Sequence, residues 1–235
     1  MIEVIKKRFP PDTYWALLID LEDRCRAEAL KAFEMVRDHA GLDKKRGREL
    51  EGQARFRMME KGFQEVCEVH GGELLTGGLI PNTNLKVFQP FMRFEHEGKG
   101  VILGLAAMPE PSGLPIKNKS RLAGVTLNYH LQPNLDLDGV GAQVGDVFIV
   151  FLISKDRERA GRLEEIAIGV ISAAYDQFLC YEPLENYLGD QEVVTDGAAP
   201  TSAAADVPAV RLKASIRPFV PPEAPKETEA EESKK

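Results

Sequence analysis

The sequence predicts an α+β fold with an N-terminal antiparallel helical hairpin, a four-stranded and mainly antiparallel sheet, a long C-terminal helix and a disordered tail. Apolar residues recur at spacings of three and four before residue 72, and at a spacing of two in the segments that follow. The helices are grouped before and after the strands instead of alternating with them, which is typical of α+β folds. We expect residues 1–189 to form one domain, because this length supports a single hydrophobic core.

Residues 1–72 are predicted to form the hairpin. The first helix begins after Pro11 and ends near Gly41, and its apolar stripe includes Leu17 and Leu21. The second helix spans residues 43–70 and ends at two glycines, which commonly terminate helices. Its expected buried side contains Leu50, Phe56, Met59, Phe63, Val66 and Cys67.

The sheet is expected within residues 73–156. Residues 86–96 alternate between apolar and polar and contain Pro90, which favours an edge strand. Residues 101–108 are apolar throughout, as in a central strand covered on both faces. Residues 123–131 alternate again, and residues 146–154 supply the fourth strand.

The last helix is predicted within residues 157–189, because Leu163, Ile166, Val170 and Ala174 follow at helical spacing. The tail, residues 190–235, is rich in Pro, Ala, Thr and Glu and is expected to be disordered. Within it, residues 209–220 alternate apolar with basic side chains. Two interpretations remain open for that segment: a short binding segment that orders on a partner, or a final strand of the chain's own sheet.

Composition narrows the function classes. The net charge is −7 without a strongly basic region, which counts against general coating of nucleic acid. No apolar run approaches the roughly 20 residues of a membrane-spanning helix, and no secretion signal is evident, so we expect a cytoplasmic protein without membrane contact. The three cysteines lack a CxxC pattern, and no catalytic motif or cofactor fingerprint occurs, so no cofactor is expected.

Basic residues at the start of the second helix form the first candidate site. Lys44, Lys45 and Arg48 stand where the helix dipole disfavours cations, and Arg55 lies two turns beyond Arg48. Gly52 between these arginines would permit the close approach of a phosphate backbone or a partner helix. Lys117 and Lys119 extend this site only if their loop folds back over the hairpin. The alternative is a balanced surface in which Glu51 bridges Arg48 and Arg55.

Two further candidate sites lie near the third and fourth strands. Thr126, Asn128 and His130 share the polar face of the third predicted strand, and they line a polar pocket if that face is covered or a solvated row if it is open. The second group is Asp136, Asp138 and Asp146, whose carboxylates suit Mg²⁺ if they converge with His130. The alternative for these acids is that they simply solvate a loop.

The missing catalytic constellation and the long helices favour a non-catalytic binding or adaptor protein that contacts itself or another protein through its helices. Nucleic-acid or other polyanion binding through the basic helix face is the second hypothesis, and a metal-dependent hydrolase is the third.

Overall fold

The computed structural model describes residues 5–6, 8–9, 11–75, 89–131 and 145–189. The chain divides into two units, residues 1–193 and 194–235, and every described residue belongs to the first. The predicted tail and its 209–220 segment therefore lie outside the described residues.

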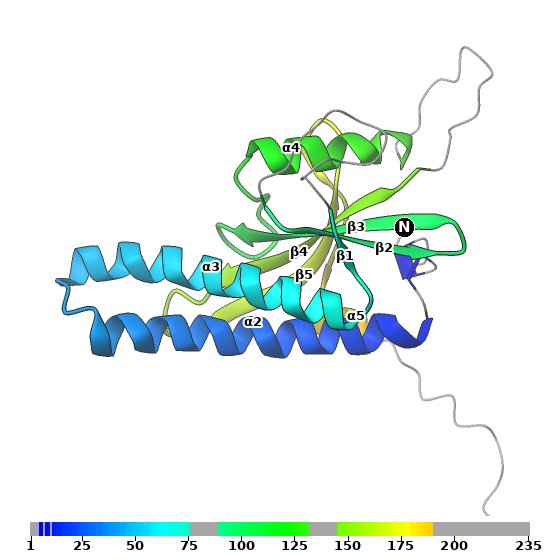
Figure 1. Cartoon of the computed structure of the whole chain (residues 1–235). Coiled ribbons are helices and arrows are strands. Elements are labelled where there is room, and N and C mark those ends of the chain that lie inside the picture. Colours follow the sequence, from blue (N-terminus) through cyan, green and yellow to red (C-terminus); the bar gives the residue numbers. More distant parts are fainter. Residues whose placement is uncertain (1–4, 7, 10, 76–88, 132–144, 190–235) are drawn as a thin grey trace, which may run out of the picture. The chain divides into compact units, whose positions relative to one another are not determined.

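The fold is α+β, with two N-terminal helices and a six-stranded mixed sheet (Figure 1). In chain order the elements are α2 (Pro11–His39), α3 (Lys44–Val69), β1 (Glu73–Leu74), β2 (Phe91–His96), β3 (Lys99–Met108), α4 (Lys119–Val125), the 3₁₀ helix η2 (Thr126–Leu131), β4 (Val147–Lys155), β5 (Leu163–Ile171), β6 (Phe178–Pro183) and α5 (Leu184–Gly189).

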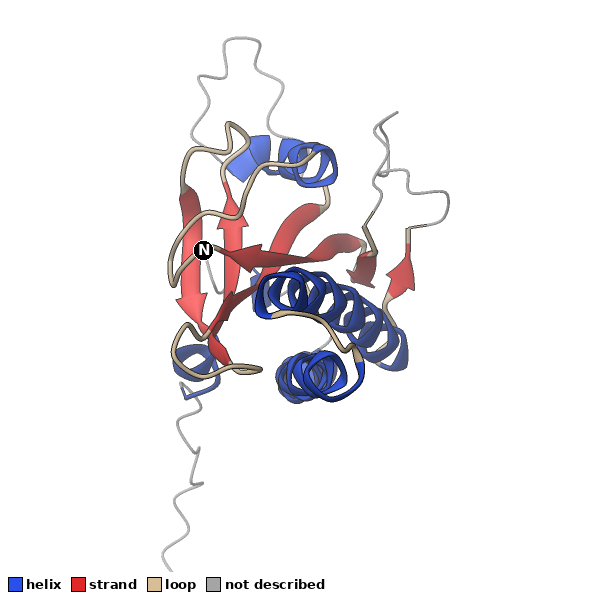
Figure 2. Ribbon diagram, turned by 90° about the vertical axis from the view of Figure 1, so that its left-hand side faces the viewer, coloured by secondary structure: helices blue, strands red, loops and turns tan. Residues whose placement is uncertain are grey.

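The predicted helical hairpin is present as α2 and α3, which pack side by side against one face of the sheet (Figure 2). The Asp43 side chain caps α3 by accepting hydrogen bonds from the backbone N–H groups of Lys45 (3.0 Å) and Arg46 (3.1 Å). The end of the hairpin that holds the turn extends beyond the sheet (Figure 1). Leu50, expected in the buried stripe, is therefore 39% exposed.

The six strands lie in chain order, β1-β2-β3-β4-β5-β6. All neighbours are antiparallel except β3 and β4, which run parallel from the pair Val101 and Val147 to the pair Met108 and Ser154. Parallel neighbours need a crossover connection, and here it contains α4 and η2. This connection places α4 on the face of the sheet opposite the hairpin (Figures 1 and 2).

Both faces of the central strands are therefore covered. Along β3, Leu103 and Leu105 pack in the cluster on the hairpin side, whereas Ile102 and Ala106 pack in the cluster on the α4 side. This double coverage explains why β3 and β4 are apolar without alternation.

The strand predicted at residues 123–131 is wrong. Residues 119–125 form α4 and residues 126–131 form η2. The apolar residues that alternate in this segment belong to a short helix that packs on the sheet. Gly124 lies so close to Phe148 that a Cβ atom at this position would be 2.8 Å from the ring.

The long C-terminal helix is also wrong, because residues 157–181 contain β5 and most of β6. Residues 166–171 of β5 are all buried, so every position of this segment is apolar. A continuous apolar segment also contains apolar residues three and four positions apart, which is why it matched the helical pattern. The sheet consequently has six strands instead of the four predicted, with β1 and β6 at its edges.

No helix in the described part of the chain is long and apolar enough to cross a lipid bilayer.

Candidate functional site

The face of α3 that enters the core continues past the edge of the sheet with different residues. Met59, Phe63 and Cys67 are fully or almost fully buried on this face. Residues at steps of three and four share a helix face, so the same face continues toward the N-terminus through Phe56, Gly52 and Arg48. Core side chains thus give way to a small residue and a cation where the sheet no longer covers α3.

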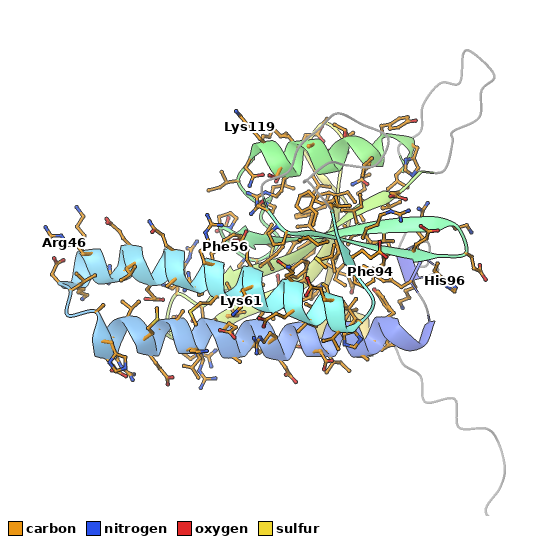
Figure 3. The ribbon with its side chains drawn as sticks, in the orientation of Figure 1. Arg46, Phe56, Lys61, Phe94, His96 and Lys119 are labelled. Carbon is orange, nitrogen blue, oxygen red and sulfur yellow. The ribbon has the colours of Figure 1, made fainter. Side chains whose placement is uncertain are left out.

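A cleft of about 630 Å³ lies where this face of α3 approaches the segment before β2 and the start of α4. In Figure 3, Phe56 is labelled on the side of α3 nearer to α4, and Lys119 at the beginning of α4. In this view the side chain of Lys119 extends away from α3. The lining residues are Gly52, Gln53, Phe56, Arg57, Gln89, Asn118, Lys119 and Ser120.

A polar network fixes the wall of this cleft. Glu60, 6% exposed, accepts hydrogen bonds from Arg57 (2.7 Å) and from the amide of Gln89 (3.3 Å). The Gln89 carbonyl oxygen accepts in turn from Asn118 (3.0 Å) and, at the long limit of 3.5 Å, from Arg121. The network connects α3 to α4 and holds the two amides in place.

Arg121 brings a buried positive charge behind the wall. Its side chain is 8% exposed, and it donates to the Ile116 carbonyl oxygen at 2.5 Å. Its Nε atom is buried without a hydrogen-bond partner, and among the described residues no carboxylate forms an ion pair with it. A buried cation without an anion beside it keeps the local potential positive.

The three cations predicted at the start of α3 are exposed around a shallow depression of about 400 Å³ at the end of the hairpin. Lys44, Lys45 and Arg48 line it together with Glu49. Within the described ranges none of the three cations forms an ion pair, whereas neighbouring Arg46 pairs with Asp43 at 2.5 Å. These cations therefore keep their charge available to a ligand.

Arg55 belongs to a different surface. Its guanidinium donates to Glu51 at 3.1 Å, and Lys155 of β4 approaches the same carboxylate at 3.5 Å. Burial lowers the pKa of Arg55, and nearby Glu51 opposes that shift. The expected bridge between Arg48 and Arg55 is thus replaced by a contact of α3 with β4, and Arg55 lies apart from the cleft.

The two lysines of the loop before α4 have separate positions. Lys119 lines the cleft, so the loop brings one of them to α3. Lys117 instead lies with its ammonium 5.6 Å from the ring centroid of Tyr175.

Thr126, Asn128 and His130 do not share one surface. Thr126 is exposed and bonds the Ala123 carbonyl at 2.6 Å, whereas Asn128 is completely buried. The Nε2 atom of His130 is buried and has no hydrogen-bond partner.

The carboxylate of Asp146 is held by Arg93, whose Nε atom donates to it at 2.9 Å. Asp136 and Asp138 lie outside the described residues. Within the described ranges, no three His, Cys, Asp or Glu side chains are grouped so that they could hold a metal ion.

Comparisons of the chain with protein-family models, with curated proteins and with solved structures find no match.

Sequence reasoning placed Phe56 in the core and did not single out Gln53, Arg57, Gln89 or Asn118. The available signal was on α3: a core stripe that changes to Gly52 and Arg48 while its spacing continues. Gln89 and Asn118 had no comparable signal, because only the folded chain brings them to α3.

Proposed function

We propose that the protein is a non-catalytic binding protein that holds a polyanion, specifically nucleic acid, along the projecting half of α3. The observation that carries the proposal is the cleft between α3 and α4, which the exposed cations Lys44, Lys45 and Arg48 continue along the helix. Phosphate groups are recognised by Lys and Arg side chains that have no competing carboxylate.

The distribution of charge supports this choice. Residues 37–57 contain seven Lys or Arg and four Asp or Glu, a local charge of +3, in a chain whose net charge is −7. An acidic body repels nucleic acid except at its basic region, so the charge pattern favours contact with the end of the hairpin.

The test replaces Lys44, Lys45 and Arg48 together by Glu and measures the affinity for a labelled single-stranded oligonucleotide by fluorescence anisotropy. We expect the wild-type affinity to fall steeply between about 50 and 200 mM salt. The triple variant should bind weakly, and its logarithmic salt slope should be smaller by about two, at roughly 0.7 per lost phosphate contact.

A matched control reverses three exposed cations on other elements, Lys31, Lys99 and Arg162. It changes the net charge equally and should retain more of the affinity than the first variant. Equal loss in both variants, or no binding to the wild type at low salt, contradicts the proposal.

A second candidate, contact with a protein partner or a second copy, is favoured by one apolar feature. A groove of about 490 Å³ on the hairpin contains Ala27, Val66 and Val69 among charged and titratable side chains, and Val69 is 82% exposed. The other lining residues are Asp20, Asp23, Arg24, Glu65 and His70. The solution mass of the wild type and of Val69→Lys, measured by analytical ultracentrifugation, tests self-association. If the wild type is monomeric at high concentration, self-association through this groove is excluded.

A cytoplasmic location completes the proposal. Cys25, Cys67 and Cys180 are free thiols, which is the usual state of cysteines in a reducing compartment.

A further inference from the structure

We propose that the cleft between α3 and α4 takes one nucleoside phosphate, as a nucleotide unit of a single strand, with its base against Phe56. This inference rests on the proposed function and names the ligand of the same site.

Phe56 and Gly52 provide the place for the base. Phe56 is partly buried: it packs against the core cluster behind it and lines the cleft in front. An aromatic ring held by the core offers a rigid platform, and bases of any sequence stack on such rings. One turn earlier, Gly52 leaves open space, because no atom lies within 4 Å of the position of a Cβ atom. A planar group can therefore lie over α3 beside the ring.

Side-chain amides that line the cleft provide hydrogen bonds to the base. Each NH₂ group of Gln89 and Asn118 uses one of its two hydrogens inside the network, which leaves one donor on each amide. The Gln89 oxygen accepts from Asn118 and Arg121, and the Asn118 oxygen accepts from the Arg121 backbone N–H, which leaves it one lone pair. The fixed wall thus offers donors, which suit the carbonyl oxygens and ring nitrogens of a base. Gln53 is exposed and adds an amide that can both donate and accept.

Cations that line the cleft provide for the phosphate. Arg57 is paired with Glu60 through one nitrogen, so most of its donors remain for an anion. Lys119 lines the cleft at the start of α4 with a flexible side chain, and Arg121 keeps the potential positive behind the wall. Arg57 comes from α3 and Lys119 from α4, so both elements supply the cleft with a cation.

The size of the cleft decides for a single strand over a duplex. A volume of about 630 Å³ is in the range of small-molecule sites, which suits one nucleotide better than a helix of paired strands. A base enters such a cleft only when it is unpaired, which is the state that proteins read in single strands.

The experiment compares two glycines of α3. Gly52 lines the cleft, whereas Gly47 does not, and each has open space around its Cβ position. Gly52→Glu and Gly47→Glu therefore add the same charge to the same helix without disturbing packing. We expect Gly52→Glu to weaken binding of a ten-nucleotide single strand about tenfold more than Gly47→Glu does, because it fills the cleft with a carboxylate.

Three further ligands identify what the cleft recognises: an abasic strand of the same length and charge, a duplex, and a free nucleoside monophosphate. The base-bearing strand should bind about tenfold more tightly than the abasic strand, and Phe56→Leu should remove that advantage while circular dichroism shows an intact fold. The ligand is a strand if the affinity increases with strand length and decreases when Lys44, Lys45 and Arg48 are replaced by Glu. Binding of the monophosphate that those reversals leave unchanged identifies a free nucleotide instead.

Failure of this inference is distinct from failure of the proposed function. If the abasic strand and the duplex bind as tightly as the base-bearing strand, and Gly52→Glu equals Gly47→Glu, the cleft takes no base although the polyanion site stands. If no ligand binds at low salt, both proposals are overturned.

Discussion

Asn128 shows how one buried polar side chain completes a sheet. Its amide donates to the carbonyl oxygens of Phe148 and Ile171, and its oxygen accepts from the Phe148 N–H group, each at 2.9 Å. The ladder between β4 and β5 begins only at Val150 and Gly169. Phe148 and Ile171 would be the pair two steps beyond that point, and the Asn128 side chain bridges them where the strands separate. Asn128, which the alternating pattern placed in a polar pocket, therefore has a structural role between β4 and β5.

Asn128→Ala should lower the free energy of unfolding by roughly 3 kcal/mol, because it leaves three backbone groups buried without partners. Urea unfolding measures this loss. The control is Thr126→Ala, on the exposed side of the same 3₁₀ helix, which should stay within about 0.5 kcal/mol of wild type. Equal effects of the two substitutions would show that the bridge contributes nothing.

His130, on the same helix, is half-buried, and its Nε2 atom is buried without a hydrogen-bond partner. Burial and the neighbouring charge of Arg8 lower the pKa of His130 below its usual value, and a hydrogen bond with the Leu127 backbone acts in the opposite direction. Arg8 is 3% exposed and bonds the carbonyl oxygens of Gly100 and Gly145, so it cannot easily move away. Protonation would place two cations together in a buried site.

We therefore expect the protein to lose stability as the pH falls below about 6.5, since the unfolded chain takes up the His130 proton first. The loss should continue until the pH passes the lowered pKa of the folded state. His130→Gln removes this dependence, so the difference in unfolding free energy between wild type and variant should shrink with falling pH. The same substitution at exposed His39 is the control. A difference that grows at low pH would contradict the lowered pKa.

Among the elements, α2 and α3 could be predicted from a single apolar stripe, and β3 and β4 from short apolar runs that follow turn or loop residues. The segment of β5 could not be predicted in this way. The segment of β5 is covered by α2 on one face and by the α4-side cluster on the other, so its apolar residues carry no period of two. Gly161, which has a φ of +74°, lies just before β5. A glycine at this position indicates a turn, so it argued against a helix that continues from residue 157.

The contact of α4 with the sheet depends on a glycine. Gly124→Ala should lower the free energy of unfolding by about 1–3 kcal/mol, because the new methyl group would meet the Phe148 ring. Gly47→Ala, in open space within α3, should instead stabilise the protein by about 0.5–1 kcal/mol. Thermal unfolding of both variants checks the opposite signs, and stabilisation by Gly124→Ala would show that α4 is not held this closely.

At the scale of the molecule, the sequence could predict which segment carries the cations, but it could not predict the cleft between α3 and α4. The basic start of α3 was readable because it opposes the helix dipole. The cleft depends on contacts between residues 29 positions apart, Gln89 with Glu60 and Asn118 with Gln89, which no local pattern contains. Arg55 illustrates the same limit, since its partner Glu51 also pairs with Lys155 of β4, a contact that sequence spacing does not reveal.

The prediction that residues 1–189 fold as one domain also belongs to this scale. Both hydrophobic clusters of the described chain lie between Ile5 and Leu184. A chain truncated after residue 189 should therefore unfold cooperatively in urea with the midpoint of the full chain, and tryptophan fluorescence of Trp15 can follow it. A truncated chain that is unfolded in buffer would show that the remaining residues are part of the domain.

The single parallel pairing in the middle of the sheet has a consequence for the kinetics of folding. Antiparallel neighbours are close in sequence and can meet early, whereas Val101 and Val147 must close a loop of 46 residues before β3 joins β4. We expect this docking of two three-stranded halves to limit the refolding rate. Shortening the side chain of Ile102 or Phe148 by substitution with Ala should then slow refolding. Substitutions in the turn between β2 and β3 should chiefly alter the rate of unfolding.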